Sequence, residues 1–542
     1  MLSLRHIHYK HPDKSVLFDD LDVAFDVRVR CALIGDNGTG KSTLLRILAG
    51  ELSATRGTVR ASSAPYLVPQ HFGQYDGGSV AEALRVREKR EALRRILAGE
   101  ADTGLLELLD DDWLLEERCR EALMQWGIGT VDLDAPLATL SGGEKTRVFL
   151  AGLDIHQPAI VLMDEPGNHL DTGGRAMLRA WIERFTGTLL LVTHDRGLLD
   201  IVDRVYELHE RGITAYGGGF DFYCEQKALH ENALRQALRA REYALKREQR
   251  GMRETLENKS KQDARGKARK QRSGIPRIAM KKLKDTAEAS TRRMKEALSD
   301  RVETLREEVA RTREQLPAAG AMKLDFASSD LHRGKILVDA VDVNYRIEGR
   351  PLWAHPVSLQ LRSGQRLRIG GANGSGKTTL IRLLLGELTA SEGVLHRAPL
   401  RSVYIDQDYS LIRAGRTVFE QARSFNHSQL PEHELRIILN RFLFDVSRVD
   451  KDCATLSGGE RMRLLLCCMM IAAKAPDVFV LDEPTNNLDM RNADILLDAI
   501  RDYEGTMVLV SHDEHFVRAL GVEEELILER YFTTARGTRG DA

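Results

Sequence analysis

Short apolar runs recur along this sequence, and several of them stop at a glycine, an acidic pair or a histidine. Residues 30–34 precede a glycine-rich segment, residues 160–163 precede Asp164, and residues 189–193 precede His194. Runs of this length are typical of strands buried on both faces, and helical stretches separate them. Strands that alternate with helices predict an α/β fold with a mainly parallel sheet.

The same pattern occurs twice in the chain. GDNGTGKST at residues 35–43 recurs as GANGSGKTT at residues 371–379, and LSGGE at residues 140–144 recurs at residues 456–460. The offset falls from 336 to 316 residues, so the first copy carries about 20 extra residues between Gln70 and Leu140. Such a repeat predicts two homologous halves, residues 1–221 and 331–542, joined by residues 222–330.

Residues 222–330 differ from both halves, because their apolar positions keep helical spacing over a long stretch. Leu238, Leu245 and Met252 lie seven residues apart, and a second series begins at Leu298. Gly274-Ile275-Pro276 interrupts the pattern between the two series. The segment therefore predicts two long antiparallel helices joined by a turn.

Basic charge is concentrated in this joining segment. The whole chain has a net charge of -1, whereas residues 246–295 carry 18 basic and 6 acidic residues, a net charge of +12. Such a density favours a polyanionic partner over a solvated helical spacer, which is the alternative. The predicted turn carries the basic residues Lys267, Arg269, Lys270, Arg272 and Arg277.

Composition excludes several other classes of protein. The chain is 42% hydrophobic and 29% charged, as globular proteins are, and its six cysteines form no CxxC pair that would indicate zinc. Its longest apolar run, residues 464–473, is far shorter than the ~20 residues of a membrane-spanning helix. The first ten residues lack the apolar block of a secretory leader. We therefore expect a cytoplasmic protein without a transmembrane segment.

Each glycine-rich segment follows an apolar strand and begins a helix, which is the context of a phosphate-binding loop. Glycines let backbone N–H groups turn toward a phosphate, the lysine reaches the β and γ oxygens, and the Ser or Thr binds Mg²⁺. The predicted nucleotide-binding residues are Gly35, Asp36, Asn37, Gly38, Thr39, Gly40, Lys41, Ser42 and Thr43 in the first copy, and Gly371, Ala372, Asn373, Gly374, Ser375, Gly376, Lys377, Thr378 and Thr379 in the second.

Acidic residues and histidines follow later strands of both copies. Asp164 and Asp482 each end an apolar run, where a carboxylate can hold Mg²⁺. The next residues, Glu165 and Glu483, are the candidate general bases for an attacking water. His194 and His512 follow another strand and are candidates to bond the γ-phosphate.

Two further pairs are candidate ligands. Gln70 and Gln407 follow predicted strands, where a neutral amide can bind Mg²⁺ or the attacking water. Tyr9 and Tyr345 each lie 26 residues before the first glycine of their loop. An aromatic face there can stack on adenine, although packing within the strand is the alternative.

The two LSGGE segments, with the phosphate loops, the acidic pairs and the histidines, resemble the tandem ATPase domains of the ABC family. The resemblance implies that the halves pack head to tail within one chain, as a monomer, and that ATP and Mg²⁺ lie between them. Each LSGGE would then face the phosphate loop of the other half. Ser141, Gly142 and Gly143 would serve the site of Lys377, and Ser457, Gly458 and Gly459 would serve the site of Lys41.

Two fused ATPase domains joined by a charged helical linker resemble the ABC-F subfamily of ribosome-binding translation factors. The resemblance implies a hairpin that contacts tRNA and rRNA near the exit site and the peptidyl-transferase centre, modulating translation or protecting ribosomes. The NHLD and NNLD stretches at residues 168–171 and 486–489 also match the subfamily. Gly167 departs from the subfamily, because threonine is usual at this position and the second half has Thr485 there. A glycine loosens the loop beside Glu165. The extra residues before the first LSGGE lie where the subfamily carries a ribosome-contacting arm, with a longer helical subdomain as the alternative.

Other functions remain open at this stage. The rival is the ATPase subunit of a transporter whose membrane subunits are separate chains, although such a subunit has no need of a basic hairpin. A DNA-repair ATPase is disfavoured by the absence of zinc-type CxxC pairs and of a very long coiled coil. Charge alone does not distinguish RNA from DNA, since phosphate contacts carry no such information.

Overall fold

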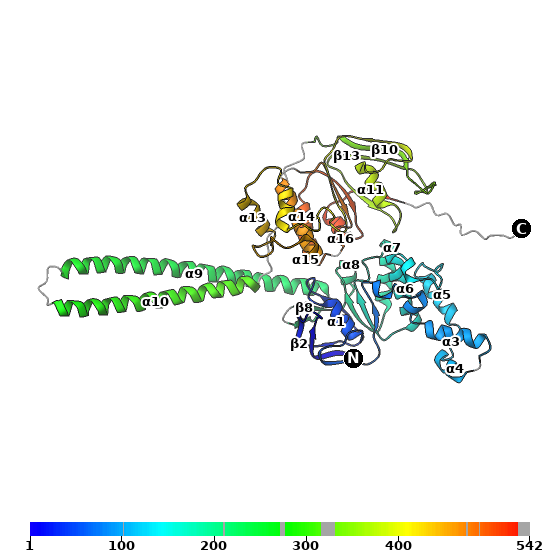
Figure 1. Ribbon diagram of the computed structural model, residues 1–542, viewed down its shortest axis with the longest axis horizontal. Coiled ribbons are helices and arrows are strands. Elements are labelled where there is room, and N and C mark those ends of the chain that lie inside the picture. Colours follow the sequence, from blue (N-terminus) through cyan, green and yellow to red (C-terminus); the bar gives the residue numbers. More distant parts are fainter. Residues whose placement is uncertain are drawn as a thin grey trace. The chain divides into compact units, whose positions relative to one another are not determined.

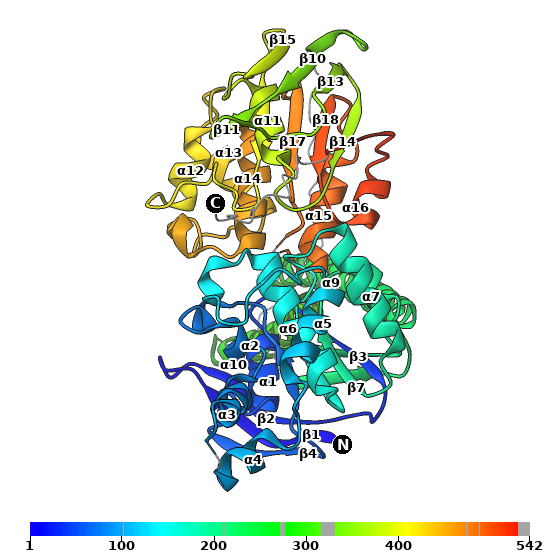
Figure 2. The same cartoon turned by 90° about the vertical axis from the view of Figure 1, so that its right-hand side faces the viewer.

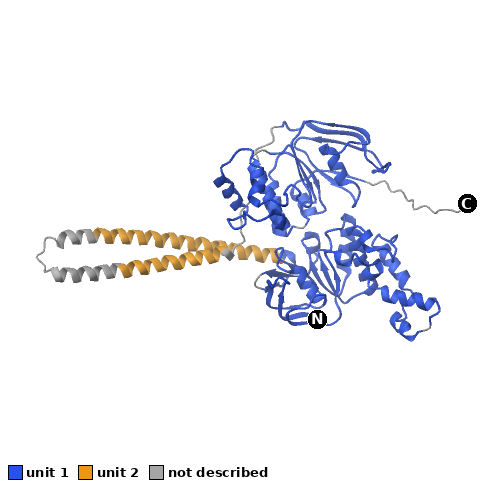
Figure 3. Ribbon diagram, viewed as in Figure 1, with its two compact units in different colours: residues 1–221, 321–542 blue, residues 222–320 orange. Residues whose placement is uncertain are grey.

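The computed structural model describes residues 1–100, 102–209, 212–270, 277–315, 331–472, 475–486 and 488–528, except the side chains of residues 262–270, 277–291, 314 and 315. Two compact units form: unit 1 comprises residues 1–221 and 321–542, and unit 2 comprises residues 222–320 (Figure 3). None of the helices in the described ranges combines the length and the apolar character needed to cross a membrane.

Six strands form the central sheet of the first half, in the order β5-β6-β7-β3-β8-β9. All neighbours are parallel except β8 and β9. The strands are β3 (Arg30–Ile34), β5 (Tyr66–Val68), β6 (Ile160–Asp164), β7 (Thr188–Val192), β8 (Arg204–His209) and β9 (Gly212–Tyr216). Because parallel strands end at one edge of a sheet, the loops after β3, β6 and β7 meet there, as the apolar runs predicted.

The second half repeats this sheet with five parallel strands in the order β16-β17-β18-β14-β19. Its strands are β14 (Arg366–Gly370), β16 (Ser402–Ile405), β17 (Val478–Asp482), β18 (Thr506–Val510) and β19 (Glu524–Ile527). The predicted mainly parallel α/β patterning is confirmed in both halves.

Each half also has an antiparallel three-stranded sheet, with orders β2-β1-β4 and β13-β10-β15. These strands are β1 (Leu2–Lys10), β2 (Val16–Phe25), β4 (Arg56–Ala61), β10 (Ile336–Asn344), β13 (Val357–Arg362) and β15 (Glu392–Arg397), and a small hairpin joins β11 (Arg346–Ile347) to β12 (Arg350–Pro351). The apolar pattern gave no sign of β4, because all six of its residues are exposed. Helices α1 (Lys41–Leu48) and α11 (Lys377–Leu385) contribute to the cores that these sheets share with the parallel sheets (Figure 2).

Each half also contains further α-helices. In the first half they are α2 (Val80–Ala83), α3 (Arg87–Leu97), α4 (Thr103–Leu109), α5 (Leu115–Gln125), α6 (Gly142–His156), α7 (Thr172–Arg184) and α8 (Arg196–Leu199). In the second half they are α12 (Val418–Ser424), α13 (Glu432–Arg441), α14 (Gly458–Ala472), α15 (Met490–Ile500) and α16 (Glu514–Ala519). The extra length of the first copy is therefore helical: α2 to α5 occupy the interval that α12 and α13 occupy in the second.

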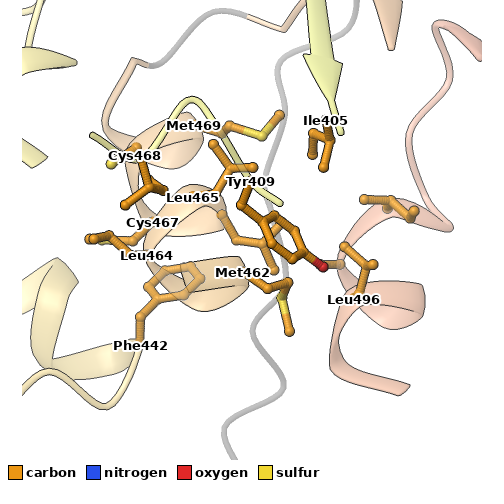
Figure 4. Packing of buried hydrophobic residues seen from close by; sticks show 14 of the residues in the cluster. Ile405, Tyr409, Phe442, Met462, Leu464, Leu465, Cys467, Cys468, Met469 and Leu496 are labelled. Carbon is orange, nitrogen blue, oxygen red and sulfur yellow. The ribbon is translucent and has the colours of Figure 1, made fainter. Parts of the chain in front are cut away.

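A large core cluster lies in the second half, around α14 (Figure 4). Cys467 and Cys468 are fully buried in it. Tyr409 is also buried there, and its hydroxyl donates a hydrogen bond of 2.8 Å to the Pro484 carbonyl. This bond ties the loop that follows Glu483 to the core.

Unit 2 is a hairpin of two long helices, α9 (Phe220–Lys270) and α10 (Arg277–Gln315) (Figure 1). Val302 and Val309 are buried between the helices, at positions that the helical spacing predicted. Arg313 and Glu242 form an ion pair of 2.6 Å across the hairpin. The predicted turn at Gly274-Ile275-Pro276, together with Arg272 and Leu316, lies outside the described residues.

Candidate nucleotide sites

The first glycine-rich loop connects β3 to α1 and curls around a lysine. Lys41 Nζ donates hydrogen bonds to the carbonyl oxygens of Gly35, at 2.7 Å, and Asp36, at 3.0 Å. Gly40 has a φ of 97°, which favours glycine, and a Cβ there would meet the Phe18 ring. The loop thus brings its backbone and one ammonium group to the start of a helix, as a phosphate-binding loop requires.

The second loop repeats this geometry between β14 and α11. Lys377 Nζ donates to the carbonyl oxygens of Gly371, at 2.8 Å, and Ala372, at 3.1 Å. The Ser375 carbonyl also accepts a hydrogen bond of 2.8 Å from the indole of Trp353, which is buried. The buried indole therefore fixes the position of this loop.

Aspartates at the ends of β6 and β17 lie beside the hydroxyls of the loops. Asp482 accepts hydrogen bonds from Thr378 Oγ1, at 3.1 Å, and from the Tyr404 hydroxyl, at 2.9 Å. Burial raises the pKa of Asp164, and a hydrogen bond from Ser42 opposes the rise. Asp164 Oδ1 is buried and has no hydrogen-bond partner among the described residues. Paired hydroxyl and carboxylate oxygens are the ligands that Mg²⁺ prefers, so the donor set fits this ion.

The glutamates that follow have an unusual backbone conformation. Glu165 has a φ of 47° and Glu483 a φ of 49°, in the left-handed region that few non-glycine residues adopt. Each backbone N–H donates a hydrogen bond of 2.8 Å to the neighbouring parallel strand, at Val192 and Val510 respectively. The hydrogen bonds to the sheet therefore keep both glutamates in this strained conformation, and strained residues of this kind cluster at functional sites.

Burial sets the protonation of these glutamates. It raises the pKa of Glu165 to about 8, and the charge of Asp164 adds to the rise. It raises the pKa of Glu483 to about 7, and the cation of Arg175 opposes this rise. A carboxyl whose pKa lies near neutrality is suited to accept a proton from water.

The histidines lie against these glutamates. His194 Nε2 is 3.4 Å from Glu165 Oε1, and His512 Nε2 is 3.3 Å from Glu483 Oε1. Burial lowers the pKa of both imidazoles to about 4, so they are neutral at pH 7. A neutral imidazole has one N–H donor, which can bond a phosphate oxygen.

A cavity of about 460 Å³ opens at the first loop, with residues of both halves in its wall. The first half contributes Lys41, Ser42, Gln70, Asp164, Glu165 and His194, and the second half contributes Thr485, Asn486, Leu488 and Asp494. The backbone N–H of Asn37 donates to Asp489 Oδ2 at 3.4 Å, across the two halves. At the other loop, Asn373 Nδ2 donates to the His169 carbonyl at 2.9 Å. Each phosphate loop thus contacts the segment that follows the acidic pair of the opposite half.

The LSGGE segments begin α6 and α14. Ser141 accepts a hydrogen bond from the backbone N–H of Glu144, and Ser457 does the same for Glu460. Such caps leave the remaining N–H groups of the first helical turn available to an anion. Gly143 faces the second loop, because a Cβ there would lie 3.5 Å from Asn373 Nδ2. Among the described residues, Ser457, Gly458 and Gly459 do not line the cavity at Lys41.

Other predicted ligands are dispersed. Gln407 is exposed, and Tyr404 instead bonds Asp482. The Tyr9 ring lies 6.5 Å from the Phe18 ring, and His11 rather than Tyr9 lines the cavity among the described residues. Tyr345 packs against the second-half core. The pairing of Tyr404 with Asp482 had no sequence signal, because it depends on β16 lying beside β17.

Comparison with known proteins adds to these observations. The sequence matches the ABC transporter family over residues 18–168 and again over residues 354–486. It is 30% identical to the uncharacterized ABC transporter ATP-binding protein YfmR of Bacillus subtilis (strain 168), over 95% of this chain and 79% of that protein. It is 31% identical to the ATP-binding protein Uup of Escherichia coli (strain K12), over 92% of this chain and 76% of that protein.

Solved structures also resemble this fold. One is the archaeal ribosome recycling factor aABCE1 in complex with the ribosomal stalk protein aP1, with a TM-score of 0.58, 20% identity, and coverage of 96% of this chain and 87% of that chain. Another is a model of ribosome-bound archaeal Pelota and ABCE1, with a TM-score of 0.53, 20% identity, and coverage of 94% and 74%.

Proposed function

Because this chain belongs to the ABC-F family of tandem ABC ATPases and therefore binds and hydrolyses ATP, we propose that it does so at two composite sites to control binding to the ribosome. The proposed domains are residues 1–221, 222–330 and 331–542. The observation that carries the proposal is the repeated pair of a strand-ending aspartate and a buried, strained glutamate beside a phosphate loop.

A few side chains in each site would carry out hydrolysis. Lys41 and Lys377 would bind the phosphates, while Ser42 with Asp164 and Thr378 with Asp482 would hold Mg²⁺, which would neutralise charge on the phosphate oxygens. Glu165 and Glu483 orient the attacking water and accept its proton. Glu165 Oε1 and Glu483 Oε1 are both buried without a hydrogen-bond partner among the described residues, which suits groups that act on a bound molecule. His194 and His512 donate from Nε2 toward the transferred phosphate.

The ribosome is the proposed partner on two grounds. The solved structures that share this fold include a ribosome recycling factor and a ribosome-bound complex. Residues 246–295 carry a net charge of +12, which suits an RNA surface. We assign this hairpin, unit 2, to contacts with tRNA and rRNA. A transporter subunit is the second candidate, but its coupling surface would face membrane subunits and would gain nothing from this charge.

The test replaces both glutamates with glutamine. Glu165→Gln with Glu483→Gln preserves shape but removes the proton acceptors, so hydrolysis should fall at least about 100-fold while ATP binding persists. Retained ATP should keep the chain on the ribosome, so co-sedimentation with ribosomes should increase. The exposed Glu504→Gln is the control and should leave both measurements unchanged.

Three outcomes separate the elements of this proposal. Parental hydrolysis by the double variant would show that these glutamates are not the bases. Loss of hydrolysis without ribosome retention would refute the partner but not the chemistry. Recovery of the trapped chain with membranes would favour the transporter subunit.

A further inference from the structure

The two halves meet asymmetrically at their histidines. Thr172, the first residue of α7, places its Oγ1 3.1 Å from Nδ1 of His512 in the other half. The repeat puts Met490, at an offset of 318, in the equivalent position of the second half. Met490 has no hydroxyl, and His194 Nδ1 is buried without a hydrogen-bond partner in the described ranges. One histidine is therefore held from across the interface and the other is not.

Arg175 adds a second contact of the same kind. Its Nη1 donates to the His512 carbonyl at 3.5 Å and to Asp195 Oδ2 at 3.2 Å, and its Nε donates to the Leu170 carbonyl at 3.3 Å. The equivalent residue of the second half is Ala493, which cannot make these bonds. Arg175 thus links the histidine loops of both halves from one side only.

A partner at Nδ1 decides where a neutral imidazole carries its proton. If the Thr172 hydroxyl donates to Nδ1 of His512, the single ring proton resides on Nε2, which lies 3.3 Å from Glu483 Oε1. The N–H at Nε2 can donate a hydrogen bond to a phosphate oxygen or to the glutamate. His194 lacks this partner, so its two tautomers are not distinguished in the same way.

We propose that Thr172 is a positioning residue that acts in trans, selecting the tautomer and orientation of His512, so that hydrolysis at the Lys377 site depends on the first half in a way that the Lys41 site does not reciprocate. Arg175 supports the same loop through the His512 carbonyl. The inference rests on the proposed roles of Glu165 and Glu483, and it makes the two ATP sites unequal by construction.

The test compares two substitutions of nearly equal size. Thr172→Val removes the hydroxyl but keeps the branched shape, whereas Thr172→Ser keeps the hydroxyl. Each is placed in the full chain together with Glu165→Gln, which leaves the Lys377 site to hydrolyse ATP, or with Glu483→Gln, which leaves the Lys41 site. The rate constant kcat and the KM for ATP are measured in all combinations.

With Glu165→Gln, we expect Thr172→Val to lower kcat about tenfold with little change in KM, the rate equivalent of one hydrogen bond, and Thr172→Ser to lose much less. The loss caused by Thr172→Val should be at least about fivefold greater with Glu165→Gln than with Glu483→Gln. Equal losses for Val and Ser, equal losses at both sites, or an effect on KM alone would overturn the proposal.

Failure of the glutamate roles is recognised separately. If both glutamine variants keep parental hydrolysis, those roles are refuted, and the comparison of Thr172→Val with Thr172→Ser in the parental chain still decides whether the hydroxyl matters. A lower kcat for Val than for Ser there supports the positioning role, and equal rates refute it.

Discussion

At the residue scale, the two candidate bases occupy equivalent positions but have different electrostatic surroundings. Glu165 has a nearby aspartate as the largest charge acting on its pKa, whereas Glu483 has the cation of Arg175. Arg175 comes from the opposite half and has Ala493 as its counterpart. A single residue outside every motif therefore separates two sites that the motifs make alike.

Burial of Glu165 predicts a pH dependence of stability. Its folded pKa of about 8 lies above the unfolded value, so between pH 6.5 and 8 the unfolded chain binds fewer protons and stability falls as pH rises. His194, with a folded pKa of about 4, acts in the opposite sense and only below its unfolded pKa. The Glu165→Gln variant lacks the contribution of Glu165. Its free energy of unfolding, relative to that of the parent, should therefore rise with pH by up to about 1.4 kcal/mol per pH unit.

Urea unfolding without nucleotide and with EDTA measures this difference. In a Trp353→Phe background the remaining tryptophans all lie in the first half, so fluorescence reports its unfolding. Glu504→Gln, which is exposed, is the matched control. Parallel stability profiles of Glu165→Gln and the parent across this range would contradict the assigned burial.

At the element scale, the packing of α6 on β5 in the first half uses side chains that differ from those at the equivalent positions of the second half. The Tyr66 hydroxyl on β5 donates a hydrogen bond of 3.1 Å to the Phe149 carbonyl on α6. A Cβ on Gly152 of α6 would collide with that hydroxyl. The repeat replaces this pair by Val403 and Cys468 in the second half. In the first half a large strand residue thus faces the smallest helix residue, whereas the second half has a smaller strand residue and a larger helix residue at these positions.

This exchange predicts that the two positions are coupled. Gly152→Cys alone should destabilise the first half by about 1–3 kcal/mol through overpacking, and Tyr66→Val alone should do so through a cavity and a lost hydrogen bond. The double variant reproduces the second-half pair, so its destabilisation should be less than the sum, with a coupling energy of about 0.5–3 kcal/mol. A double-mutant cycle by urea unfolding measures it, and strict additivity would show that the two side chains do not compete for space.

At the scale of the whole molecule, the candidate catalytic groups and the basic charge are segregated. The acidic and histidine side chains of the ATP sites lie in unit 1, while the net charge of +12 lies within residues 246–295, in unit 2. Nucleotide binding and polyanion binding should therefore be separable by mutation. The proposed function requires both in one chain.

Neutralising the turn tests this segregation. Replacement of Lys267, Arg269, Lys270, Arg272 and Arg277 by Gln should weaken ribosome binding and flatten its log-log salt dependence by about 3–4, because each lost phosphate contact no longer releases counterions. ATP affinity should stay at the parental value. The control neutralises Arg306 and Arg311, which pair with glutamates of their own helix, and its change in slope should be smaller. If the five-residue variant keeps the parental salt slope, the turn is not the contact, and the extra helices of the first half become the better candidate.

The sequence by itself determined the features of this protein that are local or repeated. A strand, its terminal residue and the next loop are neighbours in the chain, so the apolar runs alone placed Asp164, His194 and the phosphate loops at strand ends, and the tandem ABC fold with a helical hairpin is confirmed. The antiparallel sheets were not predicted, and β4 gave no apolar signal because all six of its residues are exposed.

Only the tertiary structure decided which distant side chains meet. Thr172 and His512 are 340 residues apart, and neither Thr172 nor Arg175 belongs to a recognisable motif. Their contacts arise because the start of α7 in one half lies against the loop after β18 in the other, and no short-range pattern encodes such packing. The tertiary structure likewise assigned Tyr404 rather than Gln407 to Asp482, since the direction of a side chain at a strand end depends on the neighbouring strand.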